Sequence, residues 1–295
     1  MNRRQFANRL GGFAFVKIQR WLSRKSPVGA ERTGEKLGRM AFKLSKKHQL
    51  RALDNLQRAF PEKSDDERMK LAEAVLVHFG RTMSDFMRAG VRTPAEVIAS
   101  IDAEGFEKLQ TQLDKGKGVI LVTGHFGNWE RMAHFVTAKG FTLSVVARDA
   151  NDPEMQKLVY SLREAAGVEV ISRGNAARQV LTKLKRNECV GILPDQNSDE
   201  LFVPFFGVPC GTVTGPAVLG QRAGAPIMPI YCVRTGPAHY RLWLEDPLVP
   251  EPGFEPTEGL TRALNKSLEN AIRQYPDQYL WIHNRWKSAK QRGLA

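Results

Sequence analysis

Apolar and polar positions change their pattern near residue 118, and the change divides the chain into two regions. From there onward, short runs rich in β-branched residues alternate with segments whose apolar residues recur at helical spacing. The runs that predict strands are Gly118–Thr123, Thr142–Ala147, Val168–Ile171, Val190–Leu193, Ile227–Val233 and Tyr240–Leu244. The segments that predict helices are Trp129–Lys139, Pro153–Ala166, Asn175–Arg186 and Thr257–Gln274. This alternation indicates an α/β fold with a mixed, largely parallel sheet covered on both faces by helices.

Residues 1–116 read as helices instead. Proline and capping residues interrupt the helical pattern at Ser26–Pro27, at Pro61 followed by Ser64–Glu67, and at Thr93–Pro94. The sequence therefore predicts a helical N-terminal region over residues 1–116 and an α/β core over residues 117–295.

Positive charge is concentrated in the N-terminal fifth of the chain. The net charge is +13, and residues 1–60 hold 15 lysines and arginines against 3 acidic residues. A smaller basic cluster closes the chain at Arg285, Lys287, Lys290 and Arg292. This asymmetry favours an anionic partner: a membrane surface, a nucleic acid or an acidic protein. A solvated helical face is the alternative, because charge alone says little about fold.

Apolar residues in the first segment favour the membrane among these partners. Those at approximately helical spacing are Phe6, Leu10, Phe13, Ile18, Trp21 and Leu22, and the basic residues between them are Arg3, Arg4, Arg9, Lys17, Arg20, Arg24 and Lys25. Aromatic residues on one side and cations on the other are typical of a helix lying in the lipid head-group layer. The alternative is an amphipathic helix packed on its own domain. No run predicts a spanning helix, because the longest charge-free stretch, residues 201–221, contains three prolines.

Composition and cysteine usage add only exclusions. The chain is 42% apolar and 25% charged over 295 residues, which gives ample material for a core and argues against disorder. Cys189, Cys210 and Cys232 are scattered and form no CxxC pair, so neither a disulfide scaffold nor a zinc knuckle is indicated.

A histidine and a glutamate follow the first predicted strand of the core. His125 lies directly past the strand end, between Gly124 and Gly127, and chemistry in open α/β sheets collects at that edge. Asn128 is a candidate N-cap of the next helix, and Glu130 falls in its first turn. A carboxylate there can fix the imidazole tautomer and stabilise the imidazolium, which would make His125 a base for a hydroxyl proton. The alternative is a purely structural pair, with Glu130 favouring the helix N-terminus.

Other catalytic motifs fit this sequence poorly. His125, Glu130 and His134 lack the spacing of HExxH, so no metal is expected. A GxSxG nucleophile elbow, a P-loop and a glycine-rich dinucleotide fingerprint are all absent from the sequence.

The segment His125–Glu130 (HFGNWE) resembles the H-x4-D/E motif of glycerolipid-type acyltransferases, and four further segments narrow the resemblance. They are Val146–Arg148 with Asn151–Pro153, Leu193–Gln196 (LPDQ), Phe202–Gly207 (FVPFFG) followed by Thr212–Pro216, and Tyr279–Lys287 (YLWIHNRWK). In this order and register they are similar to the lipid A late acyltransferase family, which also contains acyltransferases of phosphatidylinositol mannosides. The resemblance extends over most of residues 35–290.

This resemblance implies transfer of an acyl chain from an acyl thioester to a hydroxyl of a glycolipid, with a lipid A-type precursor favoured and a phosphatidylinositol mannoside as the alternative. His125 would be the general base and Glu130 its partner, while Arg148, Asp195, Asn128 and Thr214 would bind substrate. For these four, a structural polar role is the alternative. No cofactor is implied beyond the co-substrate, which is acyl carrier protein or coenzyme A loaded with the acyl chain, acyl carrier protein being favoured.

The resemblance also implies a place in the cell, the cytoplasmic face of the inner membrane, with peripheral attachment. Family members of Gram-negative envelopes usually begin with a spanning helix, whereas this chain offers a short basic amphipathic segment. The aromatic residues Phe126, Trp129, Phe202, Phe205 and Phe206 are candidates for an acyl channel or for the core. The rival class is a nucleic-acid-binding protein that uses the basic N-terminus, but no nucleic acid is expected if the acyltransferase interpretation holds.

Overall fold

The computed structural model describes residues 16–148, 152–172, 174 and 176–295. Residues 16–23 are helical. The helices that follow are α2 (Pro27–Leu44), α3 (Lys46–Ala59), α4 (Asp65–Phe86), α5 (Pro94–Ala99), α6 (Glu107–Leu113), α7 (Trp129–Ala138), α8 (Pro153–Ala165), α9 (Ala176–Lys185), α10 (Gly215–Ala223), α11 (Pro256–Gln274) and α12 (Lys287–Gln291), with short 3-10 turns η1 (Ala89–Val91) and η3 (Pro276–Gln278). The strands are β1 (Ile101–Glu104), β2 (Val119–Val122), β3 (Leu143–Ala147), β4 (Val168–Ser172), β5 (Cys189–Ile192), β6 (Leu201–Phe205), β7 (Val208–Thr212), β8 (Ile227–Gly236) and β9 (His239–Leu244).

Seven strands form one sheet in the order β1-β9-β8-β2-β5-β3-β4. Every neighbouring pair is parallel except β8 and β9, which are antiparallel. This confirms the predicted α/β fold with a mixed, largely parallel sheet. All six predicted strands and all four predicted helices of the core are present.

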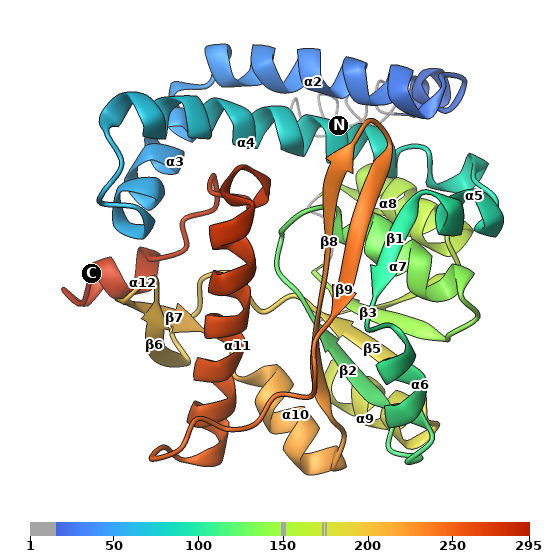
Figure 1. Cartoon of the computed structure of the whole chain (residues 1–295), viewed down its shortest axis with the longest axis vertical. Coiled ribbons are helices and arrows are strands. Elements are labelled where there is room, and N and C mark those ends of the chain that lie inside the picture. Colours follow the sequence, from blue (N-terminus) through green and yellow to red (C-terminus); the bar gives the residue numbers. More distant parts are fainter. Residues whose placement is uncertain (1–15, 149–151, 173, 175) are drawn as a thin grey trace, which may run out of the picture.

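Side chains of β2 show why the sheet needs a layer of helices on each face. Val119 and Leu121 are buried among residues of α5 to α8, whereas Ile120 and Val122 are buried among residues of α9, α10 and α11. Successive side chains of a strand point to opposite faces, so a strand that is apolar throughout must be covered twice. Figure 1 shows the helices of these two layers on either side of the sheet.

The N-terminal helices lie across one end of the sheet. α2 and α4 run side by side at the top of Figure 1. They pack closely because a Cβ on Gly34 would lie only 2.2 Å from the carbonyl oxygen of Gly80. The predicted helix starts are confirmed: Ser26 caps α2, Ser64 forms a capping box on α4, and Thr93 forms one on α5.

The prediction that residues 1–116 are purely helical is wrong at Ile101–Glu104. These residues form β1, an edge strand that pairs in parallel with β9. Only Ile101 is buried, so the segment has no apolar run that would reveal a strand. The sheet therefore includes a strand that precedes the predicted boundary at residue 117.

A hairpin that the apolar pattern did not indicate lies outside the main sheet. β6 and β7 pair in an antiparallel ribbon that packs on α11. Together with α3, α4 and the C-terminal segment it encloses an aromatic core. The buried aromatic side chains of this core are Phe42, Phe60, Phe126, Phe205, Phe206, Tyr231, Tyr279, Trp281 and Trp286.

Within the part of the chain that the structure describes, no helix is both long enough and apolar enough to cross a bilayer.

Candidate active site

The loop that carries His125 connects the carboxyl end of β2 to the start of α7. Gly127 has a positive φ of 59°, and a Cβ there would lie 2.0 Å from the carbonyl oxygen of Cys232, so only glycine fits. The backbone of the loop is held on one side by β8, because the Asn128 amide donates to that same carbonyl at 2.7 Å. The loop is thus fixed tightly against the sheet.

The C-terminal segment holds the loop on a second side. Leu280 donates its amide to the His125 carbonyl at 3.0 Å, and the Gly127 amide donates to the Gln278 carbonyl at 2.9 Å. Phe126 forms an isolated antiparallel bridge with Tyr279. A segment near the other end of the sequence therefore completes the backbone support of His125.

Asp195 orients the His125 side chain. It follows β5, which is the immediate neighbour of β2, so both residues lie at the carboxyl edge of the sheet. Its Oδ1 lies 2.8 Å from His125 Nδ1, and its Oδ2 accepts the His125 backbone amide at 2.8 Å. A carboxylate can only accept here, so Nδ1 carries the proton and Nε2 is left to take one. The two bonds to one carboxylate fix both the backbone and the ring.

The electrostatics of the pair favour a charged imidazole. Burial acts to lower the pKa of His125, but the charge and hydrogen bond of Asp195, together with the charge of Glu130, outweigh burial and raise the pKa above its usual value. Burial likewise acts to raise the pKa of Asp195, and the His125 charge and hydrogen bonds hold that pKa below its usual value. Asp195 is only 3% exposed, so this interaction is little screened by solvent. The site is thus suited to accept a proton at His125.

Glu130 does not make the contact that the sequence predicted. Its carboxylate accepts from Arg163 Nη2 at 2.6 Å, from Arg163 Nε at 3.2 Å and from Trp129 Nε1 at 3.1 Å. The expected His125–Glu130 contact is therefore corrected to His125–Asp195. Glu130 still contributes at longer range, because its charge acts to raise the pKa of His125. The reason is geometric: α8 brings Arg163 to Glu130, whereas β5 brings Asp195 to His125.

Asn128 is a structural residue in this arrangement. Its Oδ1 accepts the Arg131 amide at 2.9 Å, which confirms the predicted N-cap of α7, and its Nδ2 donates to Asp85 at 2.8 Å. The side chain is only 1% exposed. Both ends of its amide are thus bonded within the protein, and the expected contact of Asn128 with substrate stays a prediction.

Arg148 and Thr214 lie elsewhere around the site. Arg148 is exposed directly after β3, at the same sheet edge as His125 and separated from β2 by β5. Thr214 precedes α10, and its amide and hydroxyl donate to Glu200 at 2.9 and 3.0 Å. Neither is brought into hydrogen-bond contact with His125.

A hollow adjoins His125 and is lined by Val75, His78, Phe79, Trp129, Gln278, Tyr279 and Leu280. Trp129 packs edge-on against the imidazole, with ring centroids 5.2 Å apart. Of the aromatic residues considered for an acyl channel, Phe126, Phe205 and Phe206 belong to the aromatic core instead. Residues of α4 that sequence reasoning did not select thus face the site.

The C-terminal basic cluster is partly internal. Arg285 is fully buried, and it donates to the Gly211 carbonyl at 2.6 Å and to the Thr212 hydroxyl at 3.0 Å. Lys290 pairs with Asp54 of α3. Lys287 and Arg292 are exposed. The cluster therefore presents fewer free cations than its sequence indicates.

Asn55, on α3, is another residue that sequence reasoning did not select. It is buried, and its Nδ2 donates to the carbonyls of Trp281 and His283 at 2.6 Å each.

Within the described ranges, no group of three or more His, Cys, Asp or Glu side chains is arranged to hold a metal ion.

A comparison with protein families decides the family. The model of the bacterial lipid A biosynthesis acyltransferases matches residues 10–288, nearly the whole chain. The chain belongs to this family. The acyltransferase is 29% identical over 262 residues to the lipid A biosynthesis palmitoleoyltransferase of Escherichia coli K12, which covers 86% of this chain and 84% of that one. It is 26% identical over 264 residues to the lauroyltransferase of the same organism, covering 87% and 85%.

Two further likenesses lie outside the lipid A enzymes. The phosphatidylinositol mannoside acyltransferase of Mycobacterium tuberculosis is 25% identical to the acyltransferase over 225 residues, covering 72% of this chain and 69% of that one. The crystal structure of the 1-acyl-sn-glycerophosphate acyltransferase PlsC from Thermotoga maritima aligns with 15% identity and a TM-score of 0.39, covering 82% and 97%.

Proposed function

We propose that this acyltransferase moves a fatty acyl chain from an acyl thioester to a hydroxyl of a lipid A-type glycolipid precursor. The observation that carries the proposal is the His125–Asp195 pair at the carboxyl edge of the sheet, in a chain that matches the family model over residues 10–288. Two of the relatives named above are lipid A biosynthesis enzymes and a third is a phosphatidylinositol mannoside acyltransferase, and the higher sequence identity to the lipid A enzymes favours the first acceptor.

The reaction needs one base and no covalent enzyme intermediate. His125 Nε2 takes the proton of the acceptor hydroxyl as its oxygen attacks the thioester carbonyl carbon. The C–O bond forms, a tetrahedral oxyanion follows, and the C–S bond then breaks. The imidazolium returns its proton to the leaving thiolate, so the products are an ester and a free thiol. Asp195 stabilises the imidazolium while it exists, as its hydrogen bond to Nδ1 requires.

Glu130 and Arg148 take supporting roles in this proposal. Glu130 adds negative charge near His125 while its pairing with Arg163 anchors α7 to α8. Arg148 is exposed at the sheet edge and can bind a phosphate of the donor or the acceptor. Acyl carrier protein is the favoured donor, because a basic enzyme attracts an acidic carrier.

We place the enzyme at the cytoplasmic face of the inner membrane, attached peripherally. In the described part of the first segment, Ile18 and Trp21 are exposed and Lys25 lies over the Trp21 ring, whereas Leu22 is buried against the domain. Phe6, Leu10 and Phe13 lie outside the described residues. The available features are those of an interfacial helix with one edge packed on the protein.

A second surface of the same character lies on α2, which we call the α2 stripe. Leu37, Met40 and Leu44 are 44%, 52% and 78% exposed at i, i+3 and i+7, so they share one side of the helix. Lys36 and Lys43 are exposed beside them. Apolar side chains bordered by cations match an anionic lipid surface, and α2 packs on α4, whose residues line the hollow at His125.

The direct test is acylation by the purified protein. The enzyme is mixed with acyl carrier protein or coenzyme A, each loaded with a series of acyl chains, and with an under-acylated lipid A precursor. Mass spectrometry should show the precursor gain one acyl chain. A gain on phosphatidylinositol mannoside alone would favour the second acceptor, and no gain on either glycolipid would refute the proposal.

A further inference from the structure

Helix α4 presents a polar stripe, His78, Thr82 and Asp85, toward the loop that carries His125. The three residues lie at i, i+4 and i+7, which places them on one side of the helix. All three are buried, at 5%, 2% and 3% exposure. A helix that buries three polar side chains on one side must supply them with partners, because an unpaired buried polar group is costly.

The partners of His78 and Thr82 are on the loop. His78 Nε2 lies 3.0 Å from the Gly127 carbonyl oxygen, and the Thr82 hydroxyl lies 3.4 Å from the same oxygen. A carbonyl only accepts, so His78 carries its proton on Nε2. Burial lowers the pKa of His78, which keeps the ring neutral. The Gly127–Asn128 peptide is therefore bound from α4 as well as from β8, and the C-terminal segment binds the peptide before it.

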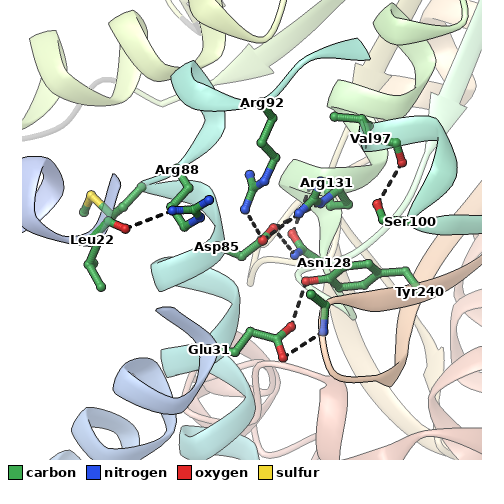
Figure 2. Close-up of polar contacts among 12 residues, drawn as sticks. Leu22, Glu31, Asp85, Arg88, Arg92, Val97, Ser100, Asn128, Arg131 and Tyr240 are labelled. Atoms are coloured by element: carbon green, nitrogen blue, oxygen red, sulfur yellow. Dashed lines mark hydrogen bonds and ion pairs between the residues drawn. The ribbon is translucent and has the colours of Figure 1, made fainter. Parts of the chain in front are cut away.

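Asp85 binds Asn128, the residue after Gly127, and the helix α7 that follows it. Its Oδ2 accepts Asn128 Nδ2 at 2.8 Å and Arg131 Nε at 3.2 Å, and its Oδ1 accepts Arg131 Nη2 at 2.7 Å. Arg92 completes the set of donors. Figure 2 shows the Asp85 carboxylate between the side chains of Arg92, Asn128 and Arg131.

The same cluster reaches the N-terminal helices. Arg88, one turn beyond Asp85, donates to the Leu22 and Ser23 carbonyls at 3.1 Å each, at the end of the helical residues 16–23. Glu31 of α2 accepts from the Tyr240 hydroxyl at 3.1 Å. Figure 2 shows the Arg88–Leu22 and Tyr240–Glu31 contacts beside the Asp85 cluster. The support of the His125 loop is thereby built into the N-terminal helical layer.

We propose that the α4 stripe of His78, Thr82 and Asp85 positions the Gly127–Asn128 peptide and thereby sets the His125 imidazole against Asp195. The inference rests on the proposed function, since it assigns positioning residues to that reaction. The clamped carbonyl belongs to the second residue after His125, so a shift of the clamp moves the ring directly. Displacements of about 1 Å can cost about 100-fold in rate.

The test compares variants that remove the clamp with one that restores it. His78→Phe keeps the ring size and removes the donor, and His78→Gln returns an N–H group near the Nε2 position. Thr82→Val removes the hydroxyl at nearly constant volume. Thr137→Val is the matched control, because its hydroxyl bonds the Ala166 carbonyl at 2.6 Å near the far end of α7.

We expect His78→Phe to lower kcat roughly 10- to 100-fold with KM changed less than about twofold. His78→Gln should recover most of that loss, Thr82→Val should lose severalfold, and the control should stay within about twofold. Because a loosened His125 loses its contact with Asp195, the pH midpoint of kcat/KM should move to lower pH in His78→Phe.

A second readout does not depend on acyl transfer. Diethyl pyrocarbonate modifies neutral imidazole, and peptide mass spectrometry reports the modification of His125 at each pH. The midpoint for His125 should fall in His78→Phe and not in Thr137→Val. If the wild-type protein acylates no glycolipid, the proposed function fails while this readout still tests the clamp.

Three outcomes would overturn the inference. One is a folded His78→Phe protein with wild-type kcat and an unchanged His125 midpoint. Another is a change confined to KM, which would make His78 a substrate contact in the hollow. The last is a folded His78→Gln protein as impaired as His78→Phe. Circular dichroism establishes folding, and if His78→Phe does not fold, an unchanged kcat and midpoint in Thr82→Val overturns the inference.

Discussion

Replacing Asp195 by asparagine removes the charge from the pair while nearly preserving its shape. In the structure one carboxylate oxygen lies 2.8 Å from His125 Nδ1 and the other accepts the His125 amide at 2.8 Å. An imidazolium at that distance from a carboxylate gains about 6 kcal/mol at an effective dielectric constant of about 20. The asparagine side chain would retain a hydrogen bond and lose most of this stabilisation, which matters only while His125 holds the proton.

The expected loss in kcat for Asp195→Asn is about 10²- to 10⁴-fold, which corresponds to roughly 3 to 5 kcal/mol. It falls below the Coulomb figure because the retained hydrogen bond and residual solvent compensate in part. The pH midpoint of kcat/KM should also move to lower pH, because Asp195 is the main group that raises the pKa of His125. At pH values above that midpoint, Asp195→Asn should keep the reduced kcat.

The assay is acyl transfer in detergent micelles with saturating donor, measured from about pH 5.5 to about pH 9, a range that spans the ordinary titration of histidine. Glu130→Gln is the matched control, because it neutralises a carboxylate that is bonded to Arg163 rather than to the imidazole. We expect Glu130→Gln to lose less than about tenfold in kcat beyond any loss of folded protein. If Glu130→Gln is the more damaging of the two with both proteins folded, the reasoning from geometry is refuted.

Other parts of the molecule allow three shorter predictions. His125→Ala should lower kcat about 10²- to 10⁴-fold with an unchanged circular dichroism spectrum, and near-normal product by mass spectrometry would contradict the proposed base. Glutamate at Leu37, Met40 and Leu44 together should weaken sedimentation with anionic vesicles more than Val249→Glu, at a site elsewhere that is 76% exposed, and equal binding would count against the α2 stripe. Burial lowers the pKa of His134 from about 6.5 to about 4. Between these two pH values the unfolded chain therefore binds one more proton than the folded protein, and the free energy of unfolding falls as pH falls through that window. The loss should be about 2 kcal/mol in the wild-type protein, as the difference in the free energy of urea unfolding between about pH 7.5 and about pH 4.5, and His134→Phe should abolish it. An unchanged pH dependence would show that His134 is not the source of the loss.

The parallel core of the fold could be predicted because its strands are apolar on both faces. A run such as Val119–Val122 must be covered twice, and the helical patterns between the runs supply the cover. β1 could not be predicted in the same way, since three of its four residues are exposed at the sheet edge. The β6–β7 ribbon was hidden by Pro204 and Pro209, which ordinarily exclude a central strand and here lie opposite each other in a two-stranded one.

The candidate site shows a different limit. His125 could be predicted because its neighbours in sequence mark a strand end and a helix start. Its partner could not, because Asp195 and Glu130 are both acidic residues near the same sheet edge, and only the adjacency of β2 and β5 brings one of them to Nδ1. In sequence, β3 and β4 lie between those two strands. The polar stripe of α4 was missed for the same reason, since nothing local connects His78 to Gly127.

The C-terminal segment, which carries part of the family resemblance, has a structural role that its basic and aromatic composition does not indicate. Arg285 and Trp286 of the C-terminal segment are buried, and the Arg285 guanidinium bonds the carbonyl and hydroxyl oxygens of β7. Leu280 of the same segment bonds the His125 carbonyl. Arg285 also acts to lower the pKa of Asp195. This basic, aromatic segment could have served as a docking surface. In the structure it instead connects the β6–β7 hairpin, the His125 loop and the charge of Asp195. Substitution of its buried residues should therefore misplace His125 and Asp195 before it affects the encounter with the acyl donor.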